Sequence, residues 1–400
     1  MKPKIYTAFM LLLFSTQIFA QCGQRYKEMI FQNVTTTTDI TYSTSNSTTL
    51  KLDVYEPQGD TASMRPLIVL AHGGSFVSGN KSNDNVVTTL CTNFAKRGYV
   101  AVSIDYRLAS FLDMLDSSKA INEVMMAISD GKSAVRFFRK DAATTNTYKI
   151  DPNHIFVGGN SAGAVLFQHY IYIDSVAEAP ATLQAIINNN GGIEGNSGND
   201  GYSSEVSALV SCAGGLNVPE FVGPGSKPVV HFHGDADAVV PYGCANAQSG
   251  ATPVRLCGLG ALDPLYQQYN VTHLSVVFPG DGHVPWGTDN AKMTKVDTMA
   301  ANFLYYTFFC TSGVGIKDMA KENEVNVYPI PATGQVNVLL TNTNDYSSVQ
   351  LIDNTGRLIS EKPVNSANIT FERNDLPAGI YFVKVMAKDA TFSVKRVVFE

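Results

Sequence analysis

The sequence is poor in charge and has no large excess of either sign. Its 400 residues carry 29 Lys and Arg against 35 Asp and Glu, a net charge of −6. Proteins that bind phosphate backbones present a basic face, so this balance argues against nucleic acid as a partner. Glycine (32) and proline (17) are not enriched, which excludes collagen-like and low-complexity chains. The apolar fraction of 44% is enough to build large folded cores.

Long hydrophobic runs are also missing. Residues 8–14 form an apolar run of seven, far below the ~20 that a membrane-spanning helix needs. Two lysines precede this run, and polar residues and the small Ala20 follow it. That order predicts a secretory signal peptide over 1–20, cleaved after Ala20, rather than a membrane span. A lipoprotein signal is the alternative, because Cys22 is close, although the residue before it is not small.

No Cys-x-x-Cys pair occurs among the six cysteines, which argues against a structural zinc site or a redox motif. In a secreted chain the thiols can instead form disulfides. Cys244 and Cys257 flank a short loop, and we predict a local bridge between them. Cys91 and Cys212 lie in apolar stretches, where isolated buried thiols are the alternative to pairing.

Apolar strand-like runs alternate with helical patterns up to about residue 310. Such alternation predicts an α/β domain with a mostly parallel sheet that is covered on both faces. Residues 49–55 alternate with period two and predict an antiparallel edge strand. The other strands are expected at 66–71, 99–104, 155–157, 208–210, 229–232 and 274–278, and the helices at 85–97, 117–140, 164–171 and 289–309.

The pattern changes to short alternating strands near the C-terminus. Turn formers separate these strands, which predicts a small all-β sandwich over 324–400. We therefore expect a first domain at 21–312 and a linker at 313–323. The sandwich segment has no Cys, His or Trp, so the chemistry is expected in the first domain.

The candidate nucleophile is Ser161, in the segment Gly159-Asn-Ser-Ala-Gly163. The pentapeptide alone is a weak signal, but here it follows a predicted strand and opens a predicted helix. A sharp strand-to-helix turn lifts a serine hydroxyl clear of the sheet, and flanking glycines leave room for the turn. A glycine-rich turn in which the serine only caps the helix is the alternative.

A serine hydroxyl needs a base to remove its proton. His283 lies in a glycine-rich loop just past a predicted strand, where open α/β sheets place their ligands. Asp237 and Asp235 both follow strand 229–232 and could orient the histidine; we favour Asp237, with Asp235 as a turn former. The neighbouring pair His231-x-His233 could hint at a metal, but no third ligand cluster accompanies it, so no metal is predicted.

Backbone N–H groups complete the candidate site. Gly73 and Gly74 follow strand 66–71, and their N–H groups together with that of Ala162 could bind a developing oxyanion. An ordinary turn at a strand end is the alternative. Trp286 lies three residues beyond His283 and is expected either to line the substrate pocket or simply to pack in the core.

The candidate serine, acid, histidine and oxyanion segments occur along the chain in the order found in the secreted α/β-hydrolase carboxylesterases. The sequence resembles this family, near the hormone-sensitive-lipase and bacterial feruloyl and acetyl esterase groups. The resemblance implies a Ser-His-Asp triad, an acyl-enzyme intermediate and no cofactor. In this family the acid directly precedes the x-Val-Val-Pro stretch, which supports Asp237. Ser75 departs from the pattern, because many members have a third glycine there. The matching segments are 72–79, 105–109, 159–163, 231–241 and 280–283.

The C-terminal segment resembles the sorting domain of type IX secretion cargo. The resemblance implies the type IX machinery as a partner and a secreted or cell-surface protein that passes through the periplasm. A carbohydrate-binding sandwich is the alternative interpretation. Such a module needs exposed aromatic residues on one face, and Tyr346 and Tyr381 alone are weak evidence for such a face. The matching segments are 327–331, 351–357, 376–381 and 394–398.

The expected activity is therefore hydrolysis of carboxylic esters, with a small-molecule or polysaccharide ester as substrate, such as acetyl or feruloyl esters of plant polysaccharide. A serine peptidase of the prolyl-oligopeptidase type shares the acid and histidine loops, but it usually carries a large extra domain, and the segment before residue 48 is too short for one. A non-catalytic hydrolase-like binding protein is the other alternative.

Overall fold

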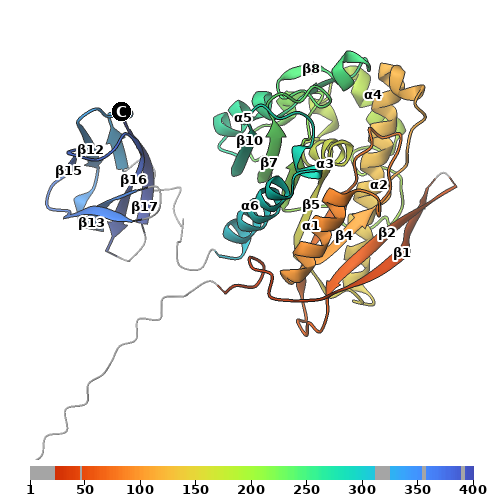
Figure 1. Ribbon diagram of the computed structural model, residues 1–400, viewed down its shortest axis with the longest axis horizontal. Helices are drawn as coiled ribbons and strands as arrows, with labels where there is room; N and C mark the ends of the chain where they lie inside the picture. The colour runs from red at the N-terminus through yellow and green to blue at the C-terminus, as the bar shows by residue number, and fades with distance from the viewer. Residues whose placement is uncertain (1–22, 46, 311–324, 354–356, 389–391) are drawn as a thin grey trace, which may run out of the picture. The chain divides into compact units, whose positions relative to one another are not determined.

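The computed structural model describes residues 23–45, 47–310, 325–353, 357–388 and 392–400 (Figure 1). Contacts within the chain separate a larger unit, Gly23–Phe309, from a second unit that contains the C-terminal strands. The predicted signal peptide over 1–20 and the predicted linker over 313–323 lie outside the described residues.

One eight-stranded sheet forms the centre of the larger unit. Neighbouring strands run parallel from β4 to β10, whereas β1 and β2 are antiparallel additions at one edge. The parallel part of the sheet places several strand ends, and the loops that follow them, along one edge, where the site lies. The order is β1 (Val34–Ser45), β2 (Thr48–Pro57), β4 (Val100–Ile104), β3 (Arg65–Ala71), β5 (Ile150–Asn160), β6 (Ala208–Cys212), β7 (Val229–Gly234) and β10 (His273–Phe278).

Helices cover both faces of this sheet and bury two apolar cores (Figure 1). Successive side chains of β3 alternate between the cores, with Leu67 and Val69 in one and Ile68 and Leu70 in the other. The helices α1 (Asn85–Lys96) and α6 (Asn290–Phe308) pack on the Ile68 face. The opposite face packs against α2 (Ser117–Ala143), α3 (Ala162–Tyr172), α4 (Ala181–Asn189) and α5 (Leu259–Gln268).

This architecture confirms the predicted α/β fold and the positions of its predicted strands and helices. The predicted edge position of residues 49–55 is wrong, because β1 pairs outside β2. Strand β1 is rich in threonine and largely exposed, so it lacks the apolar alternation that reveals a half-buried strand. Helices α4 and α5 were not predicted, and Pro264 stands inside α5, where a proline argues against a helix.

The second unit consists of two antiparallel sheets around one shared core. Val336 and Val338 contribute from one sheet and Val349 and Val383 from the other, which is the arrangement of a small sandwich, as predicted. One sheet has the order β11 (Val325–Tyr328), β12 (Gln335–Leu340) and β15 (Asn368–Glu372), and the other β14 (Leu358–Pro363), β13 (Tyr346–Asp353), β16 (Gly379–Ala387) and β17 (Phe392–Phe399).

Candidate active site

Ser161 occupies the sharp turn between β5 and α3. Its backbone has φ 53° and ψ −117°, a left-handed conformation that costs energy for any residue with a side chain. The flanking glycines are required by close packing: a Cβ on Gly159 would lie 2.4 Å from the carbonyl carbon of Gly163, and one on Gly163 would lie 2.1 Å from the oxygen of Ala71. The local sequence thus permits a strained turn that presents the Ser161 hydroxyl at the edge of the sheet.

The structure brings Ser161, His283 and Asp237 together from three separate loops. Ser161 Oγ lies 2.8 Å from His283 Nε2, and His283 Nδ1 lies 2.7 Å from Asp237 Oδ2. Because a carboxylate only accepts hydrogen bonds, Nδ1 carries the proton and Nε2 is free to accept from the serine hydroxyl. Asp237 follows β7 and His283 follows β10, which are neighbours in the sheet.

Asp237 is held as a buried carboxylate. Its Oδ1 accepts hydrogen bonds from the backbone N–H groups of Val239 and Val240, at 2.8 and 3.0 Å, and His233 Nε2 lies 3.4 Å from Oδ2. Burial alone would raise the pKa of Asp237, but the hydrogen bonds from His233 and His283 hold it well below its usual value. Asp237 therefore stays ionised at neutral pH.

Asp235 has a different partner from Asp237, and of the histidine pair it is His233 that contacts Asp237. Asp235 accepts a hydrogen bond from the backbone N–H of Gly280 at 2.6 Å, so it links the two loops that carry Asp237 and His283. Burial lowers the pKa of His231 far below its usual value. Within the described residues, no group of three or more His, Cys, Asp or Glu side chains could hold a metal ion.

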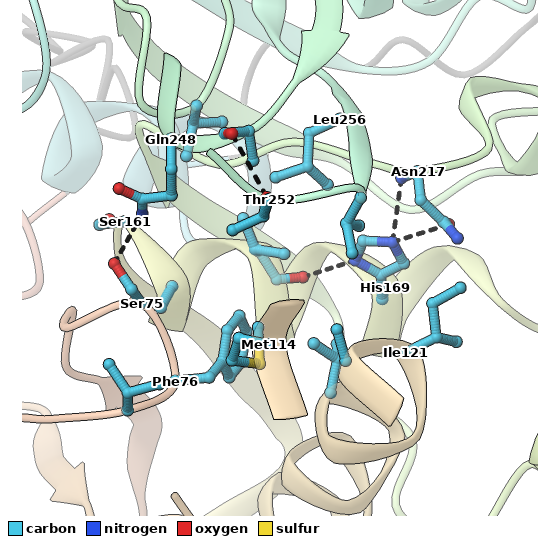
Figure 2. A pocket seen from close by; sticks show the side chains of 18 of the residues that line it. Ser75, Phe76, Met114, Ile121, Ser161, His169, Asn217, Gln248, Thr252 and Leu256 are labelled. Atoms are coloured by element: carbon cyan, nitrogen blue, oxygen red, sulfur yellow. Dashed lines mark hydrogen bonds between the residues drawn. The ribbon is translucent and has the colours of Figure 1, made fainter. Parts of the chain in front are cut away.

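An apolar cavity of about 270 Å³ opens beside Ser161 (Figure 2). Its walls come from the loop after β3, residues 111–125, helix α3 and the loop 244–257. Ser161 lies at one end, and His169 lies with Asn217 at the other (Figure 2). Most of the lining is aliphatic or aromatic, including Phe76, Met114, Ile121, Val124, Val165 and Leu256.

The loop 244–257 forms one wall of this cavity. A disulfide joins Cys244 to Cys257, as predicted, while Cys91 and Cys212 are free and buried. The side-chain amide of Gln248 donates to Ser75 Oγ at 2.7 Å, which ties this wall to the loop after β3 (Figure 2). Ser75, which departs from the family pattern, therefore has a structural partner in this chain.

Gly73 lies in the expected loop after β3, but its N–H is not free to bind an oxyanion. Its N–H donates to Asp84 Oδ2 at 2.8 Å and is thus already engaged. Among the described residues, the N–H groups of Gly74 and Ala162 have no hydrogen-bond partner. These two groups remain as candidate donors to a bound oxyanion.

Asp84 is a site residue that the sequence analysis missed. Its Oδ2 accepts from Gly73 and from the side-chain amide of Asn160 at 3.0 Å, and its Oδ1 accepts from the N–H of Val86 at 3.0 Å. One carboxylate therefore joins the loop after β3, the residue before Ser161 and the start of α1. The sequence does place Asp84 just before the predicted helix 85–97, a position typical of an N-cap. An N-cap role, however, does not predict the hydrogen bonds from Gly73 and Asn160.

Trp286 packs in the core and does not line the cavity beside Ser161. Its side chain is 1% exposed and contacts the rings of Phe232 and Phe278. The indole N–H donates to Asn160 Oδ1 at 3.4 Å. Residue 286 belongs to the sheet face covered by α1 and α6, whereas the cavity lies on the opposite face, which explains why closeness to His283 in the sequence was misleading.

Two segments of the chain match known families. Residues 52–220 match the BD-FAE family, and residues 326–400 match the secretion system C-terminal sorting domain. The second match confirms the sorting domain inferred from the C-terminal motifs and indicates a secreted or cell-surface protein. In the part of the chain that is described, no helix has both the length and the apolar character needed to cross a membrane.

Individual relatives are more distant. An AB hydrolase superfamily protein of Schizosaccharomyces pombe is 31% identical over 125 residues, which are 30% of this chain and 32% of that protein. The non-reducing polyketide synthase atr1 of Stereocaulon alpinum is 28% identical over 130 residues, 31% of this chain and 5% of the synthase. The chain therefore covers about a third or less of these curated relatives.

Solved structures share the fold of the larger unit. Thermogutta terrifontis esterase 2 phosphorylated by paraoxon is 23% identical with a TM-score of 0.53, over 68% of this chain and 95% of that one. The propionate-bound form of that esterase has a TM-score of 0.51 at 23% identity, over 70% and 96%. The larger unit therefore has the fold of solved α/β-hydrolase esterases, its residues 52–220 match the BD-FAE family, and residues 326–400 match a C-terminal secretion sorting domain.

Proposed function

We propose that the larger unit hydrolyses carboxylic esters with Ser161 as nucleophile, His283 as general base and Asp237 as the acid that orients it. The observation that carries this proposal is the hydrogen-bonded chain from Ser161 Oγ through His283 to Asp237 at the end of an apolar cavity. Backbone strain at a serine that is aligned with a histidine and a buried aspartate is typical of a catalytic site and is not needed for binding alone.

In the proposed mechanism, His283 Nε2 takes the proton of Ser161 as Oγ attacks the ester carbonyl. The N–H groups of Gly74 and Ala162 stabilise the resulting oxyanion, aided by the positive end of α3. His283 then gives the proton to the leaving alcohol. Water, deprotonated by the same histidine, hydrolyses the acyl-enzyme and releases Ser161. Asp237 remains ionised and stabilises the imidazolium throughout.

The apolar lining of the cavity favours a substrate that has an apolar group next to the scissile bond. Most of the cavity lining is apolar, and the polar side chains are those of Ser75, Ser161, His169, Asn217, Gln248 and Thr252. This lining suits an alkyl or aromatic acyl chain better than a sugar or a peptide. Solved structures of the Thermogutta terrifontis esterase include propionate-bound and butyrate-bound forms. We therefore place acetyl, butyryl and feruloyl esters, including those on plant polysaccharide, ahead of prolyl peptides.

A substrate panel tests this proposal. We expect the purified chain to hydrolyse 4-nitrophenyl butyrate with a kcat/KM of at least about 10⁴ M⁻¹s⁻¹ and to cleave a prolyl 4-nitroanilide at least about 100 times less well. Methyl ferulate and acetylated xylan in the same panel rank the two natural ester types. Efficient cleavage of the prolyl amide would favour the peptidase alternative, and no turnover of any ester would contradict the proposed function.

Asp84 is proposed to position the oxyanion loop. Asp84→Ala removes the bonds to Gly73, Asn160 and the start of α1, so the loop that carries Gly74 loses its anchor. We expect kcat to fall about 100-fold, as for the loss of one oxyanion donor, with KM changed much less, measured on 4-nitrophenyl butyrate.

Asp289→Ala is the matched control, because Asp289 also caps a helix through two backbone N–H groups, at the start of α6. If the two variants lose stability equally and neither loses kcat, the carboxylate of Asp84 only caps its helix.

A further inference from the structure

Exposed apolar side chains gather on residues 108–115, which we call the apolar lip. Leu108, Phe111, Leu112 and Leu115 are 41, 67, 73 and 44% exposed. They are four of the eight large apolar side chains that are exposed on the described part of the larger unit. An apolar cluster of this kind on a folded domain marks a surface that meets another apolar phase or molecule.

The lip continues into the cavity. Phe111, Met114 and Leu115 line the same cavity as Ser161, so an apolar path runs from the outer surface of the lip to the nucleophile. Leu108 and Leu112 do not line the cavity, although both are exposed. The cavity therefore does not account for their exposure.

Polar contacts fix the lip in this exposed position. Directly before it, Arg107 Nη2 donates to Asp130 Oδ1 at 2.8 Å in a buried ion pair. Within it, the N–H of Ala109 donates to the oxygen of Phe76 at 2.7 Å, and Asp113 pairs with Lys119 at 3.1 Å. Because both ends are anchored, the exposure is built into the fold.

We propose that the apolar lip is a docking surface for water-insoluble esters, from which the enzyme draws single molecules out of a droplet or micelle into the cavity. This inference rests on the proposed function, because its occupant is the substrate of Ser161. The continuity between the lip and the cavity wall favours that occupant over a protein partner, because three lip residues also line the cavity that contains Ser161.

A binding measurement tests the lip without any turnover. The Ser161→Ala protein is mixed with a tributyrin emulsion, and the fraction that floats with the droplets is measured. We expect this protein to bind, and Leu108→Asp/Leu112→Asp in the same background to bind about tenfold less, since two leucine side chains no longer leave water. Met64→Asp is the matched control, because Met64 is 57% exposed on the same unit but lies outside the lip.

Turnover then separates the lip from the proposed function. With Ser161 restored, Leu108→Asp/Leu112→Asp is expected to lose about tenfold in rate on emulsified tributyrin while retaining the rate on dissolved 4-nitrophenyl acetate, which also shows that it is folded. If Leu108→Asp/Leu112→Asp binds droplets as well as Met64→Asp does, the proposed docking role of the lip is wrong, even if ester hydrolysis is intact. Droplet binding that depends on the lip, in a chain that hydrolyses no ester, would instead overturn the proposed function alone.

Discussion

Replacement of Ser161 by alanine is expected to lower kcat for 4-nitrophenyl butyrate by about a millionfold, the loss seen when a triad serine is removed. Without Oγ there is no nucleophile for the carbonyl, and His283 has no hydroxyl proton to take. The cavity and the candidate oxyanion donors remain, so KM for the residual reaction should change little. Steady-state rates of wild type and variant at saturating ester measure the effect.

Covalent labelling identifies the nucleophile independently of the rates. Paraoxon should add one phosphoryl group to the wild-type chain, on the peptide that contains Ser161, and none to Ser161→Ala. Ser75→Ala is the matched control, because Ser75 is another serine of the same cavity and its loss should leave labelling in place. Labelling that persists in Ser161→Ala would show that another group is the nucleophile.

Asp237→Asn is expected to lower kcat by about 10⁴-fold, the cost of a wrong imidazole tautomer in a triad. Asparagine keeps an oxygen for the N–H groups of Val239 and Val240, but its amide donates toward His283 Nδ1. The proton of His283 then moves to Nε2, which can no longer accept from Ser161. The amide also cannot stabilise an imidazolium. Rates on the butyrate ester measure the loss.

The neighbouring Asp235→Asn is the control, because Asp235 lies in the same turn but accepts its hydrogen bond from the backbone N–H of Gly280 rather than from His283. Its kcat should stay within a few-fold of wild type. Equal losses in both variants would mean that the two loops, rather than the carboxylate of Asp237, limit the reaction.

Unfolding at different pH values gives a second readout for Asp237. Since its folded pKa is lowered, ionised Asp237 stabilises the fold above its unfolded pKa of ~3.9, and this contribution is lost as the pH falls through the folded pKa. Asp237→Asn should therefore weaken the acid dependence of unfolding.

Patterns with a strong local cause were predictable from the sequence. Strand 66–71 and helix 85–97 follow from hydrophobic periodicity, and Ser161 from glycines that a strand-to-helix turn requires. His283 and Asp237 were chosen as candidates because each follows a strand of a parallel sheet, whose strand ends meet at one edge, and the structure places the two side chains in contact. These inferences need only the order of elements along the chain.

Contacts that depend on side-chain direction were not predictable in this way. Trp286 is three residues from His283 but points to the other face of the sheet, a choice made by packing against Phe232 and Phe278. Gly73 has the expected position, yet its N–H is taken by Asp84, 11 residues away. Strand β1 was not predicted because its exposed threonines do not produce an alternating apolar pattern.

The disulfide between Cys244 and Cys257 makes assembly of the cavity depend on where the chain is oxidised. The bridge closes a loop over a sequence separation of 13, and a crosslink of this span removes about 3 kcal/mol of chain entropy from the unfolded loop. Reducing conditions inside the cell keep such thiols apart, whereas oxidising conditions outside the cytoplasm join them. For a chain with a secretion sorting domain, we therefore expect this wall of the cavity beside Ser161 to be completed outside the cytoplasm.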